Sequence, residues 1–409
     1  MSTVREEQLN LEMPAADDRS RWQQLLDWLH PQTSQPLYDR VLFTLAMSLL
    51  AFGFIMVTSA SLPTAERLTG NPFHFAIRHG VYLVVSVLVM LGTLRIPSDT
   101  WNRHSGKLLL IGLMMLLLVL VIGHEVNGSQ RWIKVGPITF QAAEVAKIFF
   151  CIYMASYLSR REDEVREATK GFIKPLVLLF IASVLLLMQP DFGTVVVLSA
   201  TTVAMLFLAG ARLWQFFAVF ITCVLALILL IIVEPYRMQR LLTFLEPEKD
   251  PFGAGYQLMQ SLIAFGQGQF SGAGLGNSIQ KLQYLPEAHT DFIMAVVAEE
   301  LGFLGVLAVI ATVLMLVWRA LIIGRRCLML EQRYGGYLAY GIGIWFSIQA
   351  FVNIGVASGA LPTKGLTLPL VSYGGNSLIV SALSVGLLLR IDHERRMSGR
   401  KVAPRGGAE

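Results

Sequence analysis

Residues 107–123 of this 409-residue chain read KLLLIGLMMLLLVLVIG, and the only charged side chain in the run is the lysine at its start. Crossing the roughly 30 Å hydrocarbon core of a bilayer takes roughly 17 to 25 consecutive apolar residues in a helix. A helix of a soluble protein would instead carry polar residues along one face. The run therefore predicts a transmembrane helix.

Nine further runs have the same apolar character, so the sequence predicts an all-α polytopic membrane protein of about ten transmembrane helices. The composition agrees, because 54% of the residues are hydrophobic and only 15% are charged, whereas soluble domains carry about 25% charged residues. Pro190 and Asp191 separate the fifth and sixth spans, since a proline inside a helix removes a hydrogen bond and clashes with the preceding turn. The predicted spans are residues 41–60, 79–94, 107–123, 142–158, 174–189, 192–211, 215–233, 292–318, 336–357 and 375–391.

The distribution of basic residues predicts the orientation, because cytoplasmic loops carry an excess of lysine and arginine. With both termini inside, 23 of the 33 Lys and Arg residues fall in cytoplasmic segments and nine fall outside. We therefore predict an N-in, C-in protein with a cytoplasmic tail at residues 1–40, a ten-helix membrane domain at 41–391 and a basic, disordered cytoplasmic tail at 392–409. A short polar loop, residues 124–141, joins helices 3 and 4, and one long extracytoplasmic loop, residues 234–291, joins helices 7 and 8. Its alternating apolar and polar patches predict an ordered segment that is partly re-entrant or interfacial.

Composition also bounds the classes of partner. The net charge of +5 does not predict a nucleic-acid partner, because the basic residues are not clustered on one element. Cys151, Cys223 and Cys327 lie in or beside apolar segments and lack the spacing of a metal site. We interpret these cysteines as ordinary core residues.

Ionisable residues inside the spans need an explanation, since each costs about 2.5–3.5 kcal/mol on insertion scales. Glu144 and Lys147 are three positions apart and can pair on one helix face. The pair either fixes helix packing or lines a polar substrate groove, and the spacing leaves both interpretations open. Asp191 is predicted to cap the helix that follows it. Of Glu299 and Glu300, one is predicted to turn inward, because neighbouring helical positions point about 100° apart.

The densest polar cluster beside a membrane entry is Leu285–Phe292, which reads LPEAHTDF. If a helix begins near Pro286, Glu287 and Asp291 share one of its faces. An aspartate at a low-dielectric interface has a raised pKa and can act as a general base. The alternative is that Thr290 and Asp291 only cap the eighth helix, and periodicity does not choose between the two.

A glycine-rich run, GQGQFSGAGLGN, occupies residues 266–277 and ends at Asn277. Exposed backbone N–H groups in such a loop can hold a diphosphate, and Arg237 and Arg240 upstream add positive charge. The alternative is a close-packed loop, because the run follows no predicted strand and a dinucleotide fingerprint requires one.

Residues 361–377 read LPTKGLTLPLVSYGGNS and separate spans nine and ten. Lys364 is the only charge there, and two prolines with three glycines predict a shaped outside loop. This segment, together with residues 250–257 and 285–292, resembles motifs of the SEDS family (shape, elongation, division and sporulation). The resemblance covers about residues 41–391. The wordings Pro-Glu-Ala-His-Thr-Asp and Pro-Thr-Lys-Gly are closer to the division branch of the family than to the elongation branch.

The resemblance implies a peptidoglycan glycosyltransferase that polymerises lipid II into β-1,4 glycan strands at the division septum, inverting the donor sugar and releasing undecaprenyl diphosphate. The family's essential acid falls on Asp291, and its fourth-helix pair falls on Glu144 and Lys147. One departure is that Ala142 stands after Gln141 where the family usually has proline, which leaves the helix start less fixed. The candidate substrate-binding residues are Glu144, Lys147, Arg131, Arg237, Arg240, Asn277, Glu287, His289, Lys364 and Ser372.

The same resemblance implies a negatively charged leaving group and a set of partners. The departing diphosphate carries negative charge, which Arg237, Arg240, Lys364 or a divalent cation (Mg or Mn) would meet. The sequence identifies no metal ligands. The expected partners are lipid II, a class B penicillin-binding protein transpeptidase, other divisome proteins and membrane lipid, at the septum in the cell inner membrane.

Two functions of other classes stay open. A lipid II flippase or transporter is supported by the Glu144–Lys147 pair and by the broken helix at Pro190, although we find no inverted repeat. A non-catalytic divisome scaffold would recruit a transpeptidase through its helices. Incubating the purified protein with lipid II separates the three, because only the enzyme makes glycan strands and only the transporter moves lipid II across liposomes.

Overall fold

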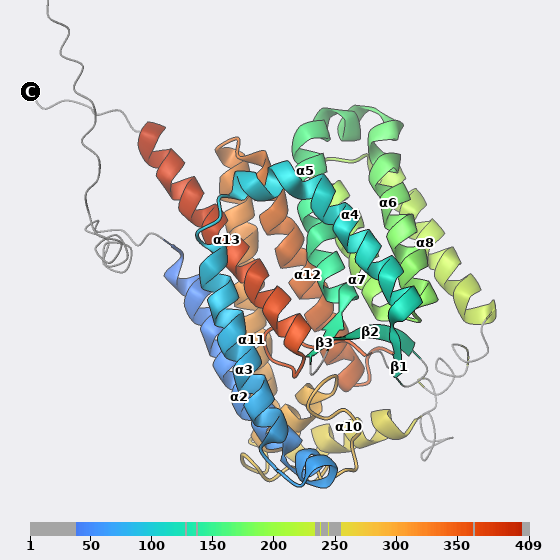
Figure 1. Cartoon of the computed structure of the whole chain (residues 1–409), viewed down its shortest axis with the longest axis vertical. Helices are drawn as coiled ribbons and strands as arrows, with labels where there is room; N and C mark the ends of the chain where they lie inside the picture. Colours follow the sequence, from blue (N-terminus) through green and yellow to red (C-terminus); the bar gives the residue numbers. More distant parts are fainter. Residues whose placement is uncertain are drawn as a thin grey trace, which may run out of the picture. The chain divides into compact units, whose positions relative to one another are not determined.

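The fold is described by a computed structural model that covers residues 38–126, 129–135, 138–233, 238, 244, 255–362 and 365–402 (Figure 1). Its main elements are helices, and it also contains one small sheet. The helices are α2 (Arg40–Thr69), α3 (His74–Thr93), α4 (Ser98–Ile122), α5 (Ala142–Glu167), α6 (Thr169–Met188), α7 (Phe192–Leu208), α8 (Leu213–Val233), α10 (Tyr256–Gly268), α11 (Ile293–Met329), α12 (Arg333–Ala357) and α13 (Gly375–Val402).

The ten predicted spans each fall on one helix, which confirms the predicted fold class. Within the described residues, eight helices are long and apolar enough to cross a membrane, and α7 and the part Leu213–Thr222 of α8 are shorter apolar helices. Asp191 caps α7 as predicted, since its carboxylate accepts from the Thr194 amide at 3.3 Å and from the Thr194 hydroxyl at 2.8 Å. The break at Pro190 is therefore a helix end followed at once by a capped helix start.

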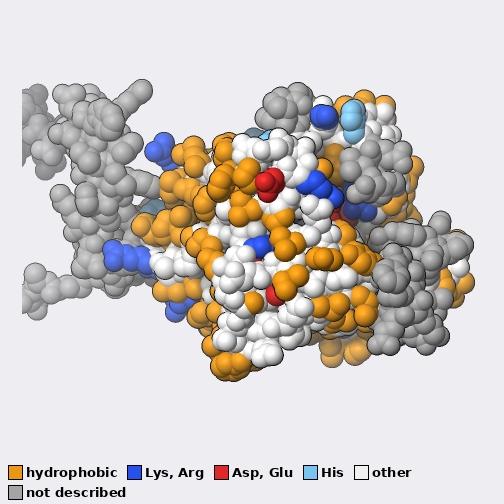
Figure 2. All heavy atoms as spheres, turned by 90° about the horizontal axis from the view of Figure 1, so that it is seen from below, with side chains coloured by type: hydrophobic (Ala, Val, Ile, Leu, Met, Phe, Trp, Pro, Cys, Tyr) orange, Lys and Arg blue, Asp and Glu red, His pale blue; other side chains and the backbone are white. Residues whose placement is uncertain are grey.

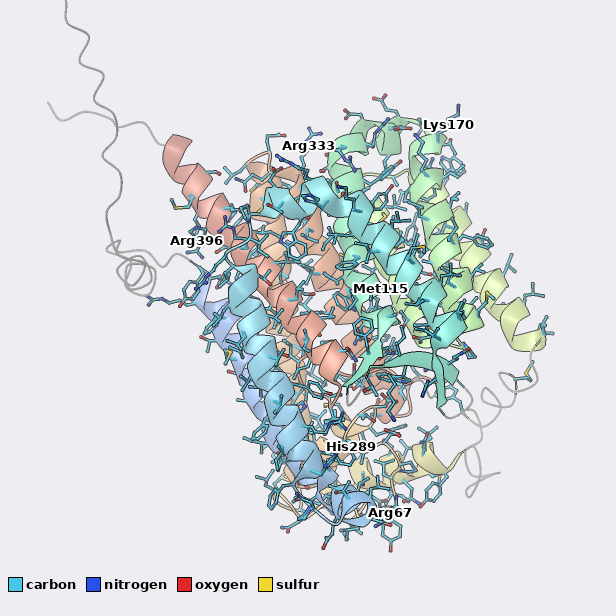
Figure 3. The ribbon with its side chains drawn as sticks, in the orientation of Figure 1. Arg67, Met115, Lys170, His289, Arg333 and Arg396 are labelled. Atoms are coloured by element: carbon cyan, nitrogen blue, oxygen red, sulfur yellow. The ribbon has the colours of Figure 1, made fainter. Side chains whose placement is uncertain are left out.

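The connections between the helices gather at two ends of the bundle, as the alternation of spans requires. Lys170 and Arg333, in segments predicted to be cytoplasmic, lie at the upper end in Figure 3. Arg67 and His289, in segments predicted to be extracytoplasmic, lie at the lower end. Seen from below in Figure 2, the lower face carries charged side chains of both signs among polar and hydrophobic ones. Which end faces the cytoplasm stays a prediction from the basic residues.

Residues 124–141, which we expected to form a polar loop, contain a three-stranded antiparallel sheet. The strands β1 (His124–Val126), β2 (Ser129–Val135) and β3 (Ile138–Gln141) pair in the order β1-β2-β3. We predicted a loop because β2 contains the charged residues Arg131 and Lys134. Its Trp132, Ile133 and Val135 favour a strand, because aromatic and β-branched residues are enriched in strands. The sheet lies close to the lower ends of α4 and α5 (Figure 1).

The long loop is ordered from residue 255 onward, as predicted. Helix α10 runs across the lower end of the bundle (Figure 1) and buries Leu258, Ser261, Ala264 and Gly268. Apart from residues 238 and 244, positions 234–254 lie outside the described residues, and they include the predicted substrate-binding residues Arg237 and Arg240. Turns and bends follow α10 as far as α11.

Helix α13 extends to Val402, eleven residues beyond the predicted end of the last span. The expectation of a disordered tail is therefore wrong for residues 392–402. Asp392 is buried and pairs with Arg395 at 2.8 Å and with Arg396 at 2.6 Å. Such pairs at spacings of three and four stabilise a helix after its apolar run ends.

Helices α5 and α12 form the centre of the bundle. Both are buried over most of their length, whereas only a minority of the residues of α3 and α4 are buried. Helix α12 packs against α5, α7 and α11. This arrangement brings the polar residues of α5 next to those of α12 and close to the start of α11.

Candidate functional site

Asp291 lies two residues before α11, in the turn that leads into that helix. Its side chain is partly exposed. The Asn353 amide of α12 donates to the Asp291 carbonyl at 2.9 Å. A Cβ built on Gly365 would lie 2.9 Å from Asp291 Oδ2, so the loop between α12 and α13 touches the carboxylate. Asp291 is thus partly exposed as a residue, and its carboxylate lies against the loop that follows α12.

Burial, with a smaller contribution from the negative charge of Glu287, raises the pKa of the Asp291 carboxyl to about 7. The Arg131 guanidinium opposes this increase, while the Asp191 carboxylate adds to it. A carboxyl with a pKa near the working pH is half ionised and suited to take a proton. The geometry therefore agrees with the sequence interpretation of Asp291 as a base.

The cap interpretation of Asp291 is wrong, as is the prediction that a helix begins near Pro286. Helix α11 begins at Ile293 with Phe292 at its N-cap and no side-chain cap hydrogen bond. Residues 285–292 instead form turns, and Glu287 has a positive φ of 54°. Glu287 is exposed and accepts from the Thr290 hydroxyl at 2.7 Å. Glu287 and Asp291 therefore do not share a helix face, and Glu287 acts on the pKa of Asp291 through its negative charge.

His289 is buried in a group of rings from three segments of the chain. Its ring centroid lies 5.1 Å from that of Phe75 and 5.3 Å from that of Tyr373. The Tyr373 amide donates to the His289 carbonyl at 3.0 Å. Burial lowers the pKa of His289, although the Glu287 charge opposes the decrease. His289 is thus a neutral packing residue that joins the Asp291 turn to residue 373.

Arg131 lies on β2 and reaches the broken junction between α6 and α7. Its guanidinium donates to the Gln189 carbonyl at 3.3 Å and to the Pro190 carbonyl. The guanidinium influences the pKa of Asp291, so the sheet brings a cation toward the carboxylate. A fixed arginine beside a carboxylate is well placed to meet an anionic group of a substrate.

Glu144 and Lys147 form a buried ion pair in α5, with Lys147 Nζ 2.9 Å from Glu144 Oε1. Only 4% of Glu144 and 3% of Lys147 is exposed. Lys147 Nζ also donates to Gln349 Oε1 of α12 at 3.0 Å and lies 5.1 Å from the Trp345 ring centroid. The pair is tied to α12 and enclosed by protein.

Glu299 and Glu300 are both buried, so the prediction that only one turns inward is incomplete. Glu299 accepts from the Ile279 amide at 2.8 Å and from the Ser278 hydroxyl. Glu300 accepts from Lys281 Nζ and from the Ser59 hydroxyl, both at 2.7 Å. The two carboxylates separate because Glu299 finds its donors in the loop that folds back over α11, whereas Glu300 finds one donor in that loop and one in α2.

The glycine-rich run packs closely on α11 at Gly268 and Gly272, whereas residues 273–277 are exposed. The Ala273 and Gly274 amides donate to the Glu299 and Glu300 carbonyls at 2.9 and 3.0 Å. These carbonyls are free because α11 is kinked at Gly302, where φ is 64° and ψ is −164°. Amides that are already bonded to backbone carbonyls are not available to cradle a diphosphate.

The remaining predicted substrate-binding residues lie in or near the loops. Asn277 is exposed, and its amide donates to the Ala273 carbonyl at 3.0 Å, which closes the glycine-rich loop. The buried Ser372 hydroxyl accepts from the Leu368 amide at 2.8 Å. Lys364 lies outside the described residues. Over the part of the chain that the structure describes, no group of three or more His, Cys, Asp or Glu side chains could hold a metal ion.

A family model described as a cell cycle protein, FtsW/RodA/SpoVE, matches residues 39–397. The chain belongs to the FtsW/RodA/SpoVE family. Two relatives are named probable peptidoglycan glycosyltransferase FtsW. That of Idiomarina loihiensis is 90% identical over 409 residues, which is the whole of both chains. That of Escherichia coli O6:H1 is 53% identical over 370 residues, which is 90% of this chain and 89% of the relative.

Two solved structures are similar to this FtsW/RodA/SpoVE member. One is described as "Structural coordination of polymerization and crosslinking by a peptidoglycan synthase complex". It matches with a TM-score of 0.72 and 30% identity, over 88% of this chain and 98% of that chain. The rod shape determining protein RodA of Thermus thermophilus matches with a TM-score of 0.66 and 26% identity, over 88% and 97% of the two chains.

Two residues of the site, Gln349 and Asn353, were not predicted from the sequence. Both are buried in α12, and their side chains contact Lys147 and the backbone of Asp291. A signal was present, because two amides four residues apart inside an apolar span are rare and must find hydrogen-bond partners.

Proposed function

We propose that this chain is a peptidoglycan glycosyltransferase that polymerises lipid II into β-1,4 glycan strands at the division septum. The observation that carries the proposal is Asp291, a partly exposed carboxyl with a pKa of about 7. Family membership and the names of the FtsW relatives support the same reaction. The apolar helices around the site keep the lipid part of the substrate in the membrane while its sugars are processed.

Asp291 is the general base of this reaction. Its carboxylate accepts the proton of the 4-hydroxyl of the acceptor sugar as that oxygen attacks the anomeric carbon of the donor. The new O–C bond forms while the bond from that carbon to the diphosphate oxygen breaks, and the diphosphate leaves on its undecaprenyl chain. A single displacement of this kind inverts an α-linked donor into a β-linked product. General-base assistance contributes roughly 10²- to 10⁴-fold to such a rate.

The leaving diphosphate needs positive charge, and Arg131 is the best-supported source. Its guanidinium is held by the Gln189 and Pro190 carbonyls and lies close enough to affect Asp291. Arg237, Arg240 and Lys364 stay proposed contacts of the diphosphate. The described residues contain no cluster that fits a resident Mg or Mn ion, so we derive no step through a metal.

The proposed partners are a class B penicillin-binding protein transpeptidase and other divisome proteins, with the chain in the inner membrane. The similar chain from a peptidoglycan synthase complex supports a transpeptidase partner, because that complex is described as coordinating polymerisation with crosslinking. A polymerase that is joined to its crosslinker delivers each new strand directly to the next enzyme.

The test is the variant Asp291→Asn, assayed with lipid II in the presence of the transpeptidase partner. We expect polymerisation to fall by roughly 10²- to 10⁴-fold, because the amide cannot take a proton. Fluorescence-detected gel filtration and binding of the partner should be unchanged, which excludes misfolding. Glycan synthesis at the wild-type rate by a folded variant would refute the base assignment. Wild-type protein that moves lipid II across liposomes without polymerising it would favour the flippase instead.

A further inference from the structure

One face of α12 carries three polar or aromatic side chains at intervals of four residues: Trp345, Gln349 and Asn353. Residues at this spacing lie above one another on a helix. All three are buried, and only 1% of Gln349 and 1% of Asn353 is exposed. A buried amide is costly unless its hydrogen bonds are made, so the partners of Gln349 and Asn353 indicate what the face does.

Gln349 joins the buried ion pair of α5 to the loop that follows α12. Its Oε1 atom accepts from Lys147 Nζ at 3.0 Å and from Trp345 Nε1 at 2.7 Å. Its Nε2 atom donates to the Thr367 carbonyl at 2.9 Å. Lys147 thus fixes the orientation of the amide, because the oxygen must face the ammonium group and the nitrogen must face the loop.

Asn353 joins the same loop to the backbone of Asp291. Its Nδ2 atom donates to the Leu366 carbonyl at 2.6 Å and to the Asp291 carbonyl at 2.9 Å. The two amides therefore hold the adjacent carbonyls of Leu366 and Thr367. Gly365 is the residue of this segment whose α-carbon faces the Asp291 carboxylate.

The surroundings of Lys147 give no room for a sugar. Two voids touch its side chain, and each holds about 10 Å³, which is room for one water molecule. Apolar residues line most of both voids. A charge that is enclosed in this way acts through its hydrogen bonds.

We propose that Gln349 and Asn353, the amide pair, are positioning residues for Asp291, and that Lys147 acts through Gln349 and not on the saccharide. The amide pair sets the distance between residues 365–367 and the carboxylate, and it fixes the backbone of Asp291 itself. This inference rests on the proposed function for its activity readout. A misplacement of about 1 Å at a reacting group lowers a rate by roughly 10²-fold, which gives the amide pair a measurable effect.

The test uses the near-isosteric variants Asn353→Leu and Gln349→Met, with Asn102→Leu as the matched control. Asn102 accepts from the buried Ser156 hydroxyl at 2.6 Å, at the end of α4 remote from Asp291. We expect each amide-pair variant to lower kcat for lipid II by roughly 10- to 100-fold with KM within about two-fold. The acid limb of the pH–rate profile should also shift. The control should lose similar thermal stability but keep the wild-type kcat and pH profile.

The double variant Gln349→Met/Asn353→Leu tests whether the two amides act as one unit. If they hold the same segment, the double variant should lose about as much activity as the worse single variant. Losses that multiply would show that each amide acts alone and would overturn the shared role.

A readout without catalysis separates this inference from the proposed function. Amide hydrogen exchange at residues 288–292 and 365–372 should accelerate in both amide-pair variants and stay unchanged in Asn102→Leu. If the wild-type protein makes no glycan but this exchange accelerates, the proposed function fails and the positioning role stands. If Asn353→Leu keeps the wild-type kcat, acid limb and exchange rates, the positioning role is wrong.

Discussion

At the scale of the residue, Asp291 combines reactivity with a cost in stability. Its folded pKa of about 7 lies above the ordinary aspartate value near 4. The folded protein therefore binds a proton more tightly than the unfolded chain does. Stability from this group is complete below pH 4, falls as the pH rises from about 4 to 7, and is constant above that.

This linkage predicts that Asp291→Asn is more stable than the wild-type protein at pH 8, by up to roughly 4 kcal/mol, since one pKa unit corresponds to about 1.4 kcal/mol. The advantage should disappear near pH 4, where the wild-type carboxyl is also neutral. Thermal unfolding in detergent at pH 4.5 and pH 8 measures the difference. An advantage of equal size at both pH values would show that the carboxyl is not strained by its surroundings.

At the scale of the element, the approach of α10 to α11 depends on glycine where no side chain fits. A Cβ on Gly268 would overlap the Ala298 carbonyl, whereas a Cβ on Gly266, in the same helix, would meet nothing within 4 Å. The end of α10 can therefore lie against the backbone of α11 just before its kink at Gly302. The turn that contains Asp291 leads into this same helix.

We expect Gly268→Ala to destabilise the protein and to lower its activity, because the backbone carbonyl cannot move aside without displacing α10. Gly266→Ala is the control, and it should be neutral or stabilise the protein by roughly 0.5–1 kcal/mol, since alanine favours a helix over glycine. Thermal unfolding and polymerisation of both variants provide the comparison. Equal stability of the two variants would contradict the close packing of α10 on α11.

At the scale of the whole molecule, buried ions tie the lower end of the bundle together. Lys281 Nζ lies 2.7 Å from Glu300 Oε1 and donates to the Ser59 hydroxyl at 2.8 Å. These three residues belong to the segment before α11, to α11 and to α2. Because 0% of Glu300 is exposed, its charge is stable in the fold only with its cation in place.

Lys281→Met should therefore cost roughly 3–5 kcal/mol, because it leaves a buried carboxylate without its cation. Removing both charges with Lys281→Met/Glu300→Met should cost less than the single change, since no unpaired charge remains. Melting temperatures of the purified single and double variants report this order. A double variant that is less stable than Lys281→Met would show that the pair contributes more than mutual neutralisation.

The sequence by itself determined the ten helices and the cap at Asp191. These features are local, because about twenty apolar residues in a row, or a carboxylate at a helix start, have the same preference in any fold. The interpretation of residues 124–141 as a loop was wrong, because their strands are stabilised by pairing with one another.

Only the tertiary structure decided which groups meet at the site. Asn353 bonds to a residue 62 positions away, and Ser59 bonds to one 241 positions away. The kink of α11 at Gly302 likewise gives the glycine-rich run two backbone carbonyls to bond, those of Glu299 and Glu300. A hydrogen bond of this kind forms only if two segments far apart in the chain come to the right separation within a few tenths of an ångström. A linear pattern of residue types does not contain those separations.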